Sequence, residues 1–266
     1  MLSKLKKVIP QSLRDRLRPQ WKMLEEEWKE LAFALQHNQA QTKKSGLRAA
    51  ANLEEAFRFA QTEFGICQNS GEILPALQYI QGIKPIVAGE VGTCNSGNVF
   101  LFLQAFSELR TLIAVDLLVK NRAKLRFYAP EPATIHCVHG HSCAPQTTQQ
   151  VRQALNGGKF DFIFIDGDHE YEGVRADLLQ YGPLVRLGGL VGFHDIVPDH
   201  FVRYGRKGPS YAGDVHLLWS QLKARCRTRE FIVDPDQDGA GIGVVEWGEN
   251  MTPILAEVAN LKKNDP

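Results

Sequence analysis

The feature that most constrains this chain is a regular alternation of short apolar segments and amphipathic ones between about residues 86 and 194. Two of the apolar segments, TLIAVD at 111–116 and FDFIFID at 160–166, are apolar continuously rather than at every second position. Continuous apolarity indicates strands that are buried on both faces, as in a parallel sheet covered by helices on each side. The pattern therefore predicts an α/β fold built on a doubly wound sheet.

The same alternation of segments gives approximate bounds for each expected strand and helix. Strands are expected at 86–90, 111–116, 133–138, 160–166 and 189–194, followed by a hairpin of 229–234 and 241–247 around the turn-rich PDQDGA. Helices are expected at 49–64, 70–81, 97–109, 119–127, 146–156, 170–181 and 214–226. The long stretch 196–213 has no periodic pattern and is expected to form a lid, with an ordinary solvated loop as the alternative. The segment after Asn250 has no clear pattern either.

The chain is expected to divide into an N-terminal helical extension with a linker (1–46), a single α/β domain (47–250) and a C-terminal tail (251–266). Residues 1–22 carry seven basic residues and one acid, which fits either peripheral contact with an anionic membrane or a solvated extension. Five apolar residues then follow heptad spacing, namely Trp21, Leu24, Trp28, Leu31 and Leu35. This spacing predicts a helix that packs onto the domain or onto a second subunit in a homo-oligomer.

The composition narrows the class of protein. A hydrophobic fraction of 44% and a net charge of +1 indicate a soluble globular protein and argue against a nucleic-acid partner. The five cysteines include no C-x-x-C pair, so a reducing compartment is expected. No apolar stretch approaches the roughly 18 residues that span a bilayer, and no secretory signal is evident. These observations predict a cytoplasmic location, with membrane association as the alternative for residues 1–22.

Polar residues gather where the expected parallel strands end. They are Glu90, Asp116, His139 with His141 and Ser142, Asp166 with Asp168 and His169, and His194 with Asp195. In parallel α/β sheets, ligands bind beyond the carboxyl ends of the strands. The concentration of ionisable groups at one edge therefore predicts the functional site of the chain.

The first strand leads into the turn EVGTCNSGNV, in which Glu90 precedes Gly92 and Ser96–Gly97 open a helix. A strand, a glycine turn and a helix start form the local geometry of a Rossmann-like nucleotide site. Asp116 follows Gly92 by 24 residues, the spacing at which an acid on the second strand binds both hydroxyls of a ribose. The alternatives are a helix cap or a surface acid for Asp116, and a purely structural role for Glu90.

The ordered set EVGTCNSGNV, LIAVD, HGHS, FDFIFIDGDHEYEGVRADL, LVRLGGLVGFHD and GIGVV resembles the class I S-adenosylmethionine-dependent methyltransferases. It is most similar to the small-molecule branch with IDGDH and HD at the ends of strands four and five, and the resemblance covers about 68–247. It implies a seven-stranded sheet of order 3-2-1-4-5-7-6 with the last strand antiparallel. It also implies S-adenosyl-L-methionine as methyl donor, with its methionine part at Glu90 and Gly92, its ribose at Asp116, and its adenine beside His141 and Ser142. Common versions of the turn contain more glycine than this one does.

The acids and histidines of strands four and five form a second group. Some members of the resembled family hold a divalent cation there, which implies Asp166, Asp168, His194 and Asp195 as metal ligands. A shell of carboxylates and an imidazole suits Mn²⁺ or Fe²⁺ at least as well as Mg²⁺. Asp166 and His169 are the expected catalytic residues, with His169 as general base. The alternative is that the strand-five pair only binds loops and that His169 only begins a helix.

Together these features predict a methyltransferase that acts on an oxygen of a small hydroxylated acceptor, such as a sugar or glycan precursor. The lid offers aromatic and basic side chains for that acceptor, namely Arg203, Tyr204, Arg206, Lys207 and Tyr211. Three alternatives stay open. A nicotinamide-dependent dehydrogenase would share the glycine turn, but the chain lacks G-x-G-x-x-G here. A metal-dependent hydrolase would leave Glu90 and Asp116 without a role, and a non-catalytic scaffold would work through its N-terminal helices.

Overall fold

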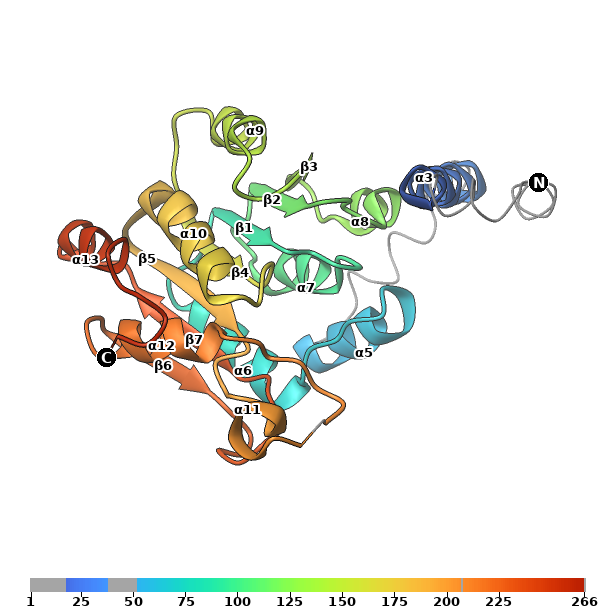
Figure 1. Cartoon of the computed structure of the whole chain (residues 1–266). Coiled ribbons are helices and arrows are strands. Elements are labelled where there is room, and N and C mark those ends of the chain that lie inside the picture. The colour runs from blue at the N-terminus through green and yellow to red at the C-terminus, as the bar shows by residue number, and fades with distance from the viewer. Residues whose placement is uncertain (1–17, 38–51, 207, 266) are drawn as a thin grey trace.

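The computed structural model describes residues 18–37, 52–206 and 208–265, and every structural statement below concerns these residues. Seven strands form one sheet in the order β3-β2-β1-β4-β5-β7-β6 (Figure 1). They are β1 (Val87–Val91), β2 (Thr111–Asp116), β3 (Thr134–His139), β4 (Phe160–Ile165), β5 (Val185–His194), β6 (Thr228–Phe231) and β7 (Ile242–Glu246). Strands β1 to β5 pair in parallel, and β7 runs antiparallel to both β5 and β6. The predicted seven-stranded order is confirmed.

Strand β4 shows why the sheet lies in the middle of the molecule. All six of its residues are buried, as its continuous apolarity predicts. Phe162 and Phe164 belong to one hydrophobic core, whereas Ile163 and Ile165 belong to the core on the opposite side. Both faces of the strand are therefore covered.

Helices form a layer on each face (Figure 1). One core contains residues of α5 (Leu53–Glu63), α6 (Ser70–Gln81), α7 (Gly97–Ala105) and α8 (Arg122–Tyr128). The other contains residues of α9 (Pro145–Leu155), α10 (Tyr171–Tyr181), α12 (Val215–Lys223) and α13 (Met251–Val258). The architecture is the doubly wound α/β fold that the sequence predicts.

Several elements differ from their expected bounds. Helix α13 has no counterpart among the expected elements, yet Met251, Ile254 and Val258 lie at spacings of three and four and are buried in the core, because packing against an existing core stabilises a short helix. Strand β5 begins before residue 189 because Val185 pairs with Phe160 across an irregularity in the register. The expected lid contains the short helix α11 (His200–Tyr204), and a 3₁₀ turn η2 (Gly182–Leu184) precedes β5.

The helix predicted from the heptad residues is α3 (Arg18–His37), which lies against α8 (Figure 1). The heptad stripe itself faces away, since Leu24, Trp28, Leu31 and Leu35 are each about half exposed or more. The contact uses charged and aromatic side chains on the opposite face of α3 instead, and contact with a second subunit stays a prediction. The segments expected to touch a membrane and to link α3 to the domain fall largely on 1–17 and 38–51, outside the described residues. Among the described helices, none is both long and apolar enough to span a bilayer.

The strand registers align the carboxyl ends of the central strands. Val91 of β1 is level with Val115 of β2 and with Ile165 of β4, and Ile165 is level with Phe193 of β5. Asp116 is level with His139. The residues that follow each strand therefore emerge side by side at one edge of the sheet.

Candidate active site

A cavity of about 430 Å³ opens at this edge. Its lining comes from the ends of β1 to β4 and from the lid, and it includes Gly92, Asp116, Leu117, His141, Ser142, Asp168, His169, Glu170 and Tyr211. A second cavity of about 40 Å³ lies on the other side of Gly92 and is lined by Gln68, Thr93, Cys94, Asn98 and Asp166, among others. The structure thus brings together at one edge the residues that the sequence assigned to two separate groups.

Gly92 lines both cavities, and no residue with a side chain fits at its position in the turn. Its φ is +87°, and a Cβ at this position would lie 2.0 Å from the backbone oxygen of Asp166. The chain after β1 therefore passes directly over the chain after β4. The turn achieves this with few glycines because Cys94 and Ser96 themselves adopt left-handed backbone conformations, with φ of +48° and +66°.

Asp116 holds this turn in place. Its Oδ2 accepts a hydrogen bond from the Cys94 N–H at 2.9 Å, and its Oδ1 accepts one from the Leu118 N–H at 2.9 Å. The carboxylate also lines the large cavity. It can therefore anchor the turn and face a ligand from the same position.

His141 and Ser142, which follow β3, also line the large cavity. The hydroxyl of Tyr181, on α10, donates to the Ser142 carbonyl at 2.7 Å. His141 Nδ1 accepts from the Cys143 N–H at 3.3 Å. Helix α10, which follows β4, thus holds this loop in place. His141 and Ser142 then line the cavity, where a flat group would contact them.

Unpartnered polar atoms concentrate around the small cavity. Three buried side-chain oxygens of its lining have no hydrogen-bond partner among the described residues, namely Gln68 Oε1, Thr93 Oγ1 and Asn98 Oδ1, and a fourth such oxygen, Glu90 Oε2, belongs to the side chain that bonds Asn98. Burying such an atom unpaired costs about 1–3 kcal/mol. All four are oxygens, so the pocket is chemically suited to a group that donates several hydrogen bonds.

Glu90 lies behind this pocket. It is 1% exposed, and its Oε1 accepts a hydrogen bond from Asn98 Nδ2 at 2.8 Å. Burial and the neighbouring charge of Asp166 raise its pKa well above the usual range. Asn98 and Gln68 are functional candidates that the sequence reasoning missed. Asn98 follows Glu90 by eight residues and could have been found as a polar residue in an otherwise apolar helix, whereas no local signal marks Gln68.

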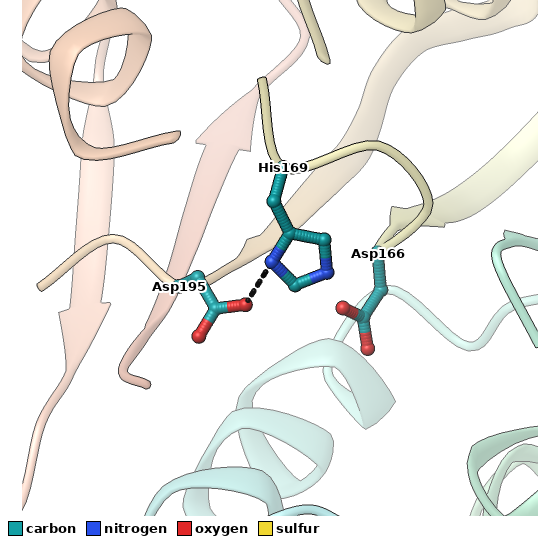
Figure 2. A group of neighbouring side chains, drawn as sticks. All are labelled: Asp166, His169 and Asp195. Carbon is teal, nitrogen blue, oxygen red and sulfur yellow. Dashed lines mark ion pairs between the residues drawn. The ribbon is translucent and has the colours of Figure 1, made fainter. Parts of the chain in front are cut away.

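The second group centres on Asp195 (Figure 2). One of its oxygens, Oδ2, lies 3.0 Å from His169 Nδ1 and 3.1 Å from His194 Nδ1. Its Oδ1 accepts from the Ala240 N–H at 3.1 Å. The backbone of Asp195 has a φ of +61°, a strained conformation for a residue with a side chain. Although burial opposes the charged form, the hydrogen bonds from both imidazoles hold the pKa of Asp195 well below its usual range.

Asp166 and His194 form a buried pair of opposite charge. Asp166 Oδ1 lies 3.5 Å from His194 Nδ1, and Asp166 Oδ2 accepts from Gln68 Nε2 at 3.0 Å. Burial raises the pKa of Asp166 to about 6, against the opposing charge of His194. Burial favours neutral His194, but the charges of Asp166 and Asp195 outweigh it and raise its pKa to about 9. The hydrogen bond to Asp195 likewise raises the pKa of His169, against burial.

Three of these residues can converge on one cation. Asp166, His169 and Asp195 each offer a ligand atom, and the three atoms lie within 4.8 Å of one another. Figure 2 shows the imidazole of His169 between the two carboxylates. The carboxylate of Asp168 instead accepts a hydrogen bond from the Glu170 N–H at 2.9 Å, at the start of α10. The ligand set Asp166, Asp168, His194 and Asp195 therefore stays a prediction, and His169 joins the candidates.

The lid reaches the site through Tyr211. Its ring lies 5.9 Å from the ring of His169, and its hydroxyl donates to Glu170 Oε1 at 2.8 Å. Arg203 pairs with Asp236 at 3.2 Å, in the turn between β6 and β7. Of the described lid side chains proposed to meet an acceptor, Tyr211 is the one that lines the large cavity, and Lys207 lies outside the described residues.

Comparisons with known proteins agree with this architecture. Residues 90–196 match a family model described as a methyltransferase domain. No curated protein sequence gives a significant match. A solved structure of MycE methyltransferase from the mycinamycin biosynthetic pathway, in complex with Mg and SAH, is 18% identical with a TM-score of 0.51. The match covers 74% of this chain and 55% of MycE, so the chain spans about half the length of that protein. An O-methyltransferase from Bacillus cereus, in complex with SAH, is 16% identical over 73% of this chain and 90% of its own, with a TM-score of 0.51. At these identities the likeness establishes the fold.

Proposed function

We propose that this chain, a class I S-adenosylmethionine-dependent methyltransferase, methylates a hydroxyl oxygen of a small acceptor such as a sugar or a glycan precursor. The observation that carries the proposal is the position of Gly92. It joins a cavity of nucleoside size to a pocket of unpaired oxygens, beside an imidazole held by a carboxylate. Each part suits one portion of the donor or one step of the transfer.

The large cavity would take the nucleoside. Asp116 would accept hydrogen bonds from the ribose hydroxyls, and His141 and Ser142 would lie beside the adenine. The bound donor supplies a methyl group on a positively charged sulfur, already activated for attack. The residues of the chain must therefore position that group rather than activate it.

The small pocket would take the amino group of the methionine part. Its volume of about 40 Å³ exceeds the roughly 10–15 Å³ that one water-sized group needs, so an ammonium group fits there. The unpaired oxygens of Gln68, Glu90, Thr93 and Asn98 are the acceptors that an ammonium group needs. Binding there would relieve the cost of burying them unpaired.

His169 would remove the proton from the acceptor hydroxyl. Asp195 Oδ2 lies 3.0 Å from Nδ1 of this imidazole, an ion-pair contact that would favour the proton on Nδ1 and leave the other ring nitrogen to take a proton (Figure 2). A positioned base contributes about 10²–10⁴-fold to the rate. Alignment of the hydroxyl with the methyl group contributes more, with about 7–11 kcal/mol available from effective molarity.

A divalent cation, Mn²⁺ or Mg²⁺, is the alternative partner for these residues. Asp166, His169 and Asp195 would hold it, with Asp168 and His194 as further candidates from the sequence. Bound there, a cation would orient the acceptor hydroxyl and lower its pKa. The complex of MycE with Mg supports this version of the site. His169 cannot act as ligand and base through the same nitrogen, so metal dependence of turnover separates the two roles.

The acceptor would enter from the lid side, where the largely exposed Tyr211 lines the cavity beside His169. The complex of MycE with mycinamycin VI supports a small-molecule acceptor in this fold. An aromatic ring beside the base would suit the flat face of a sugar or another ring.

Calorimetry with three ligands tests the proposal. S-Adenosylmethionine and S-adenosylhomocysteine should bind saturably, NAD⁺ should not, and Asp116→Ala should abolish the binding. Glu108→Gln, at an exposed position away from the cavities, is the matched control. Titrations with and without Mn²⁺ or Mg²⁺ show whether a cation joins the complex. Saturable NAD⁺ binding, with neither methionine nucleoside bound, would reject the methyltransferase reading of the site.

A further inference from the structure

Helix α3 is joined to the start of α8 by a carboxylate that is distant in sequence. Glu30 Oε1 accepts from the Arg122 N–H at 2.9 Å, and Glu30 Oε2 accepts from the Ala123 N–H at 2.6 Å. The partners are 92 and 93 residues apart. The side chains of Glu30 and Arg122 are only 12% and 13% exposed. This contact is a buried cap supplied by one helix to another.

Helix α8 needs this cap because its own cap residue is used elsewhere. Asn121 adopts a φ of +55° and makes no side-chain hydrogen bond to the helix. Its Nδ2 donates instead to the Asn95 carbonyl at 2.9 Å, in the glycine turn after β1. The first amide groups of α8 would otherwise lack a side-chain acceptor, so Glu30 replaces the local cap.

The segment between Asp116 and α8 is tied to the glycine turn along its length. Ser96 Oγ donates to the Lys120 carbonyl at 2.7 Å, and Lys120 Nζ donates to Asn95 Oδ1 at 3.2 Å. At the Asp116 end, the Leu118 N–H reaches the carboxylate. The position of α8 therefore fixes the loop and the turn on both sides of Asp116.

A second contact from α3 supports the same loop. Arg122 Nη2 donates to Glu27 Oε1 at 2.7 Å, and Arg122 Nη1 lies 3.0 Å from His139 Nε2. His139 Nδ1 in turn accepts from the Val119 N–H at 3.1 Å. Two acids of α3 are thus linked through one arginine to the loop that carries Asp116.

We infer that Glu30 is a positioning residue for the donor, acting through α8 on the loop 116–121 and hence on Asp116. The loop needs such support because Leu117, which lines the large cavity, is 73% exposed and adds little packing. Helix α3 therefore tunes donor affinity without touching the donor. This inference rests on the proposed nucleoside site.

The test is donor affinity in the full-length protein. Glu30→Gln keeps the size of the side chain but places an amide NH₂ against one of the two N–H groups. We expect the Kd for S-adenosylhomocysteine and the KM for S-adenosylmethionine to rise about five- to tenfold, the size of a lost cap, with kcat at saturating donor unchanged. Glu26→Gln is the matched control, because Glu26 pairs with Lys29 on the same helix at 2.6 Å.

Phe33→Ala is a second variant that loosens the same contact without altering the cap. The ring of Phe33 meets that of Phe127 on α8 at 5.8 Å, so its loss should weaken donor binding in the same direction. Unchanged donor affinity in both variants, or a fall in kcat alone, overturns the inference. Asp116→Ala distinguishes a failure of this inference from a failure of the proposed nucleoside site. If it abolishes binding while Glu30→Gln and Phe33→Ala do not weaken it, the inference fails alone; if Asp116→Ala binds normally, the proposed site fails with it.

Discussion

Strand β4 has an aspartate at each end, and the two have opposite surroundings. Asp161, at the amino end, has a side chain 11% exposed, and Asp166, just past the carboxyl end, has one 15% exposed. Asp161 Oδ2 accepts from the Ile86 and Val87 N–H groups at 2.8 and 2.7 Å, and its Oδ1 pairs with Arg186. Asp166 has one hydrogen bond, from Gln68, and a pKa raised to about 6. The two carboxylates are thus similarly buried, but Asp161 has more hydrogen-bond and ion-pair partners than Asp166.

The comparison separates a structural carboxylate, Asp161, from a candidate functional one, Asp166. Asp161 joins β4 to the segment before β1 and to β5, so its charge is neutralised by contacts that hold the sheet together. Asp166 shares its surroundings with Asp195 and His194, and the unpaired oxygens of the small cavity lie beside it. Titratable groups whose burial lowers the stability of the fold are typical of binding and catalytic sites.

The largest effect is expected at Asp195. Asp195→Asn removes the anion that bonds both imidazoles, so turnover should fall about 10²–10⁴-fold while donor affinity is retained. Measured kcat and the Kd for S-adenosylhomocysteine give the two numbers. Asp161→Asn serves as control at the other end of the sheet and should leave kcat of the folded protein unchanged. Full activity in Asp195→Asn would contradict the assignment of the catalytic edge.

The second effect concerns stability and should differ between the two ends of β4. Asp161→Ala leaves two backbone N–H groups without an acceptor, so the free energy of unfolding should fall by about 2–4 kcal/mol. Asp166→Ala relieves the repulsion between the carboxylates of Asp166 and Asp195 but removes one counter-charge of His194, so the two changes should offset and the loss should stay within about 1 kcal/mol. Urea denaturation of both variants measures this. Equal losses at the two positions would remove the distinction.

The third effect is a pH dependence at His194. Its pKa is about 9 in the folded protein, above the ordinary value of 6.5, so its stabilising contribution is complete below about pH 6.5 and is lost as the pH rises through 9. One such group gives a slope of at most about 1.4 kcal/mol per pH unit. In metal-free buffer, His194→Gln should flatten the stability profile between these values. Parallel profiles for the two proteins would show that His194 is not charged in the fold.

Several features of the fold could be predicted because they depend on local pattern. The continuous apolarity of 111–116 and 160–166 identified strands covered on both faces, and polar residues at strand ends identified the functional edge. Helix α6 spans Ser70–Gln81, the expected bounds, and Asn69 caps it through a contact between near neighbours, the kind of contact that a local pattern can indicate. Helix α13 escaped prediction because its burial depends on a core made by distant segments.

The sequence by itself determined the class of fold, the edge of the sheet where the candidate groups gather and the identity of Glu90, Gly92, Asp116, Asp166, His169 and Asp195 as candidates. Periodicity and residue type are enough for this, since they are properties of neighbouring positions. Only the tertiary structure decided which of these side chains meet. Gln68 joins Asp166 from 98 residues away, and Glu30 caps α8 from 92 residues away. Such contacts arise when independent elements pack at fixed registers, and no local pattern encodes the distance between two side chains that different elements bring together.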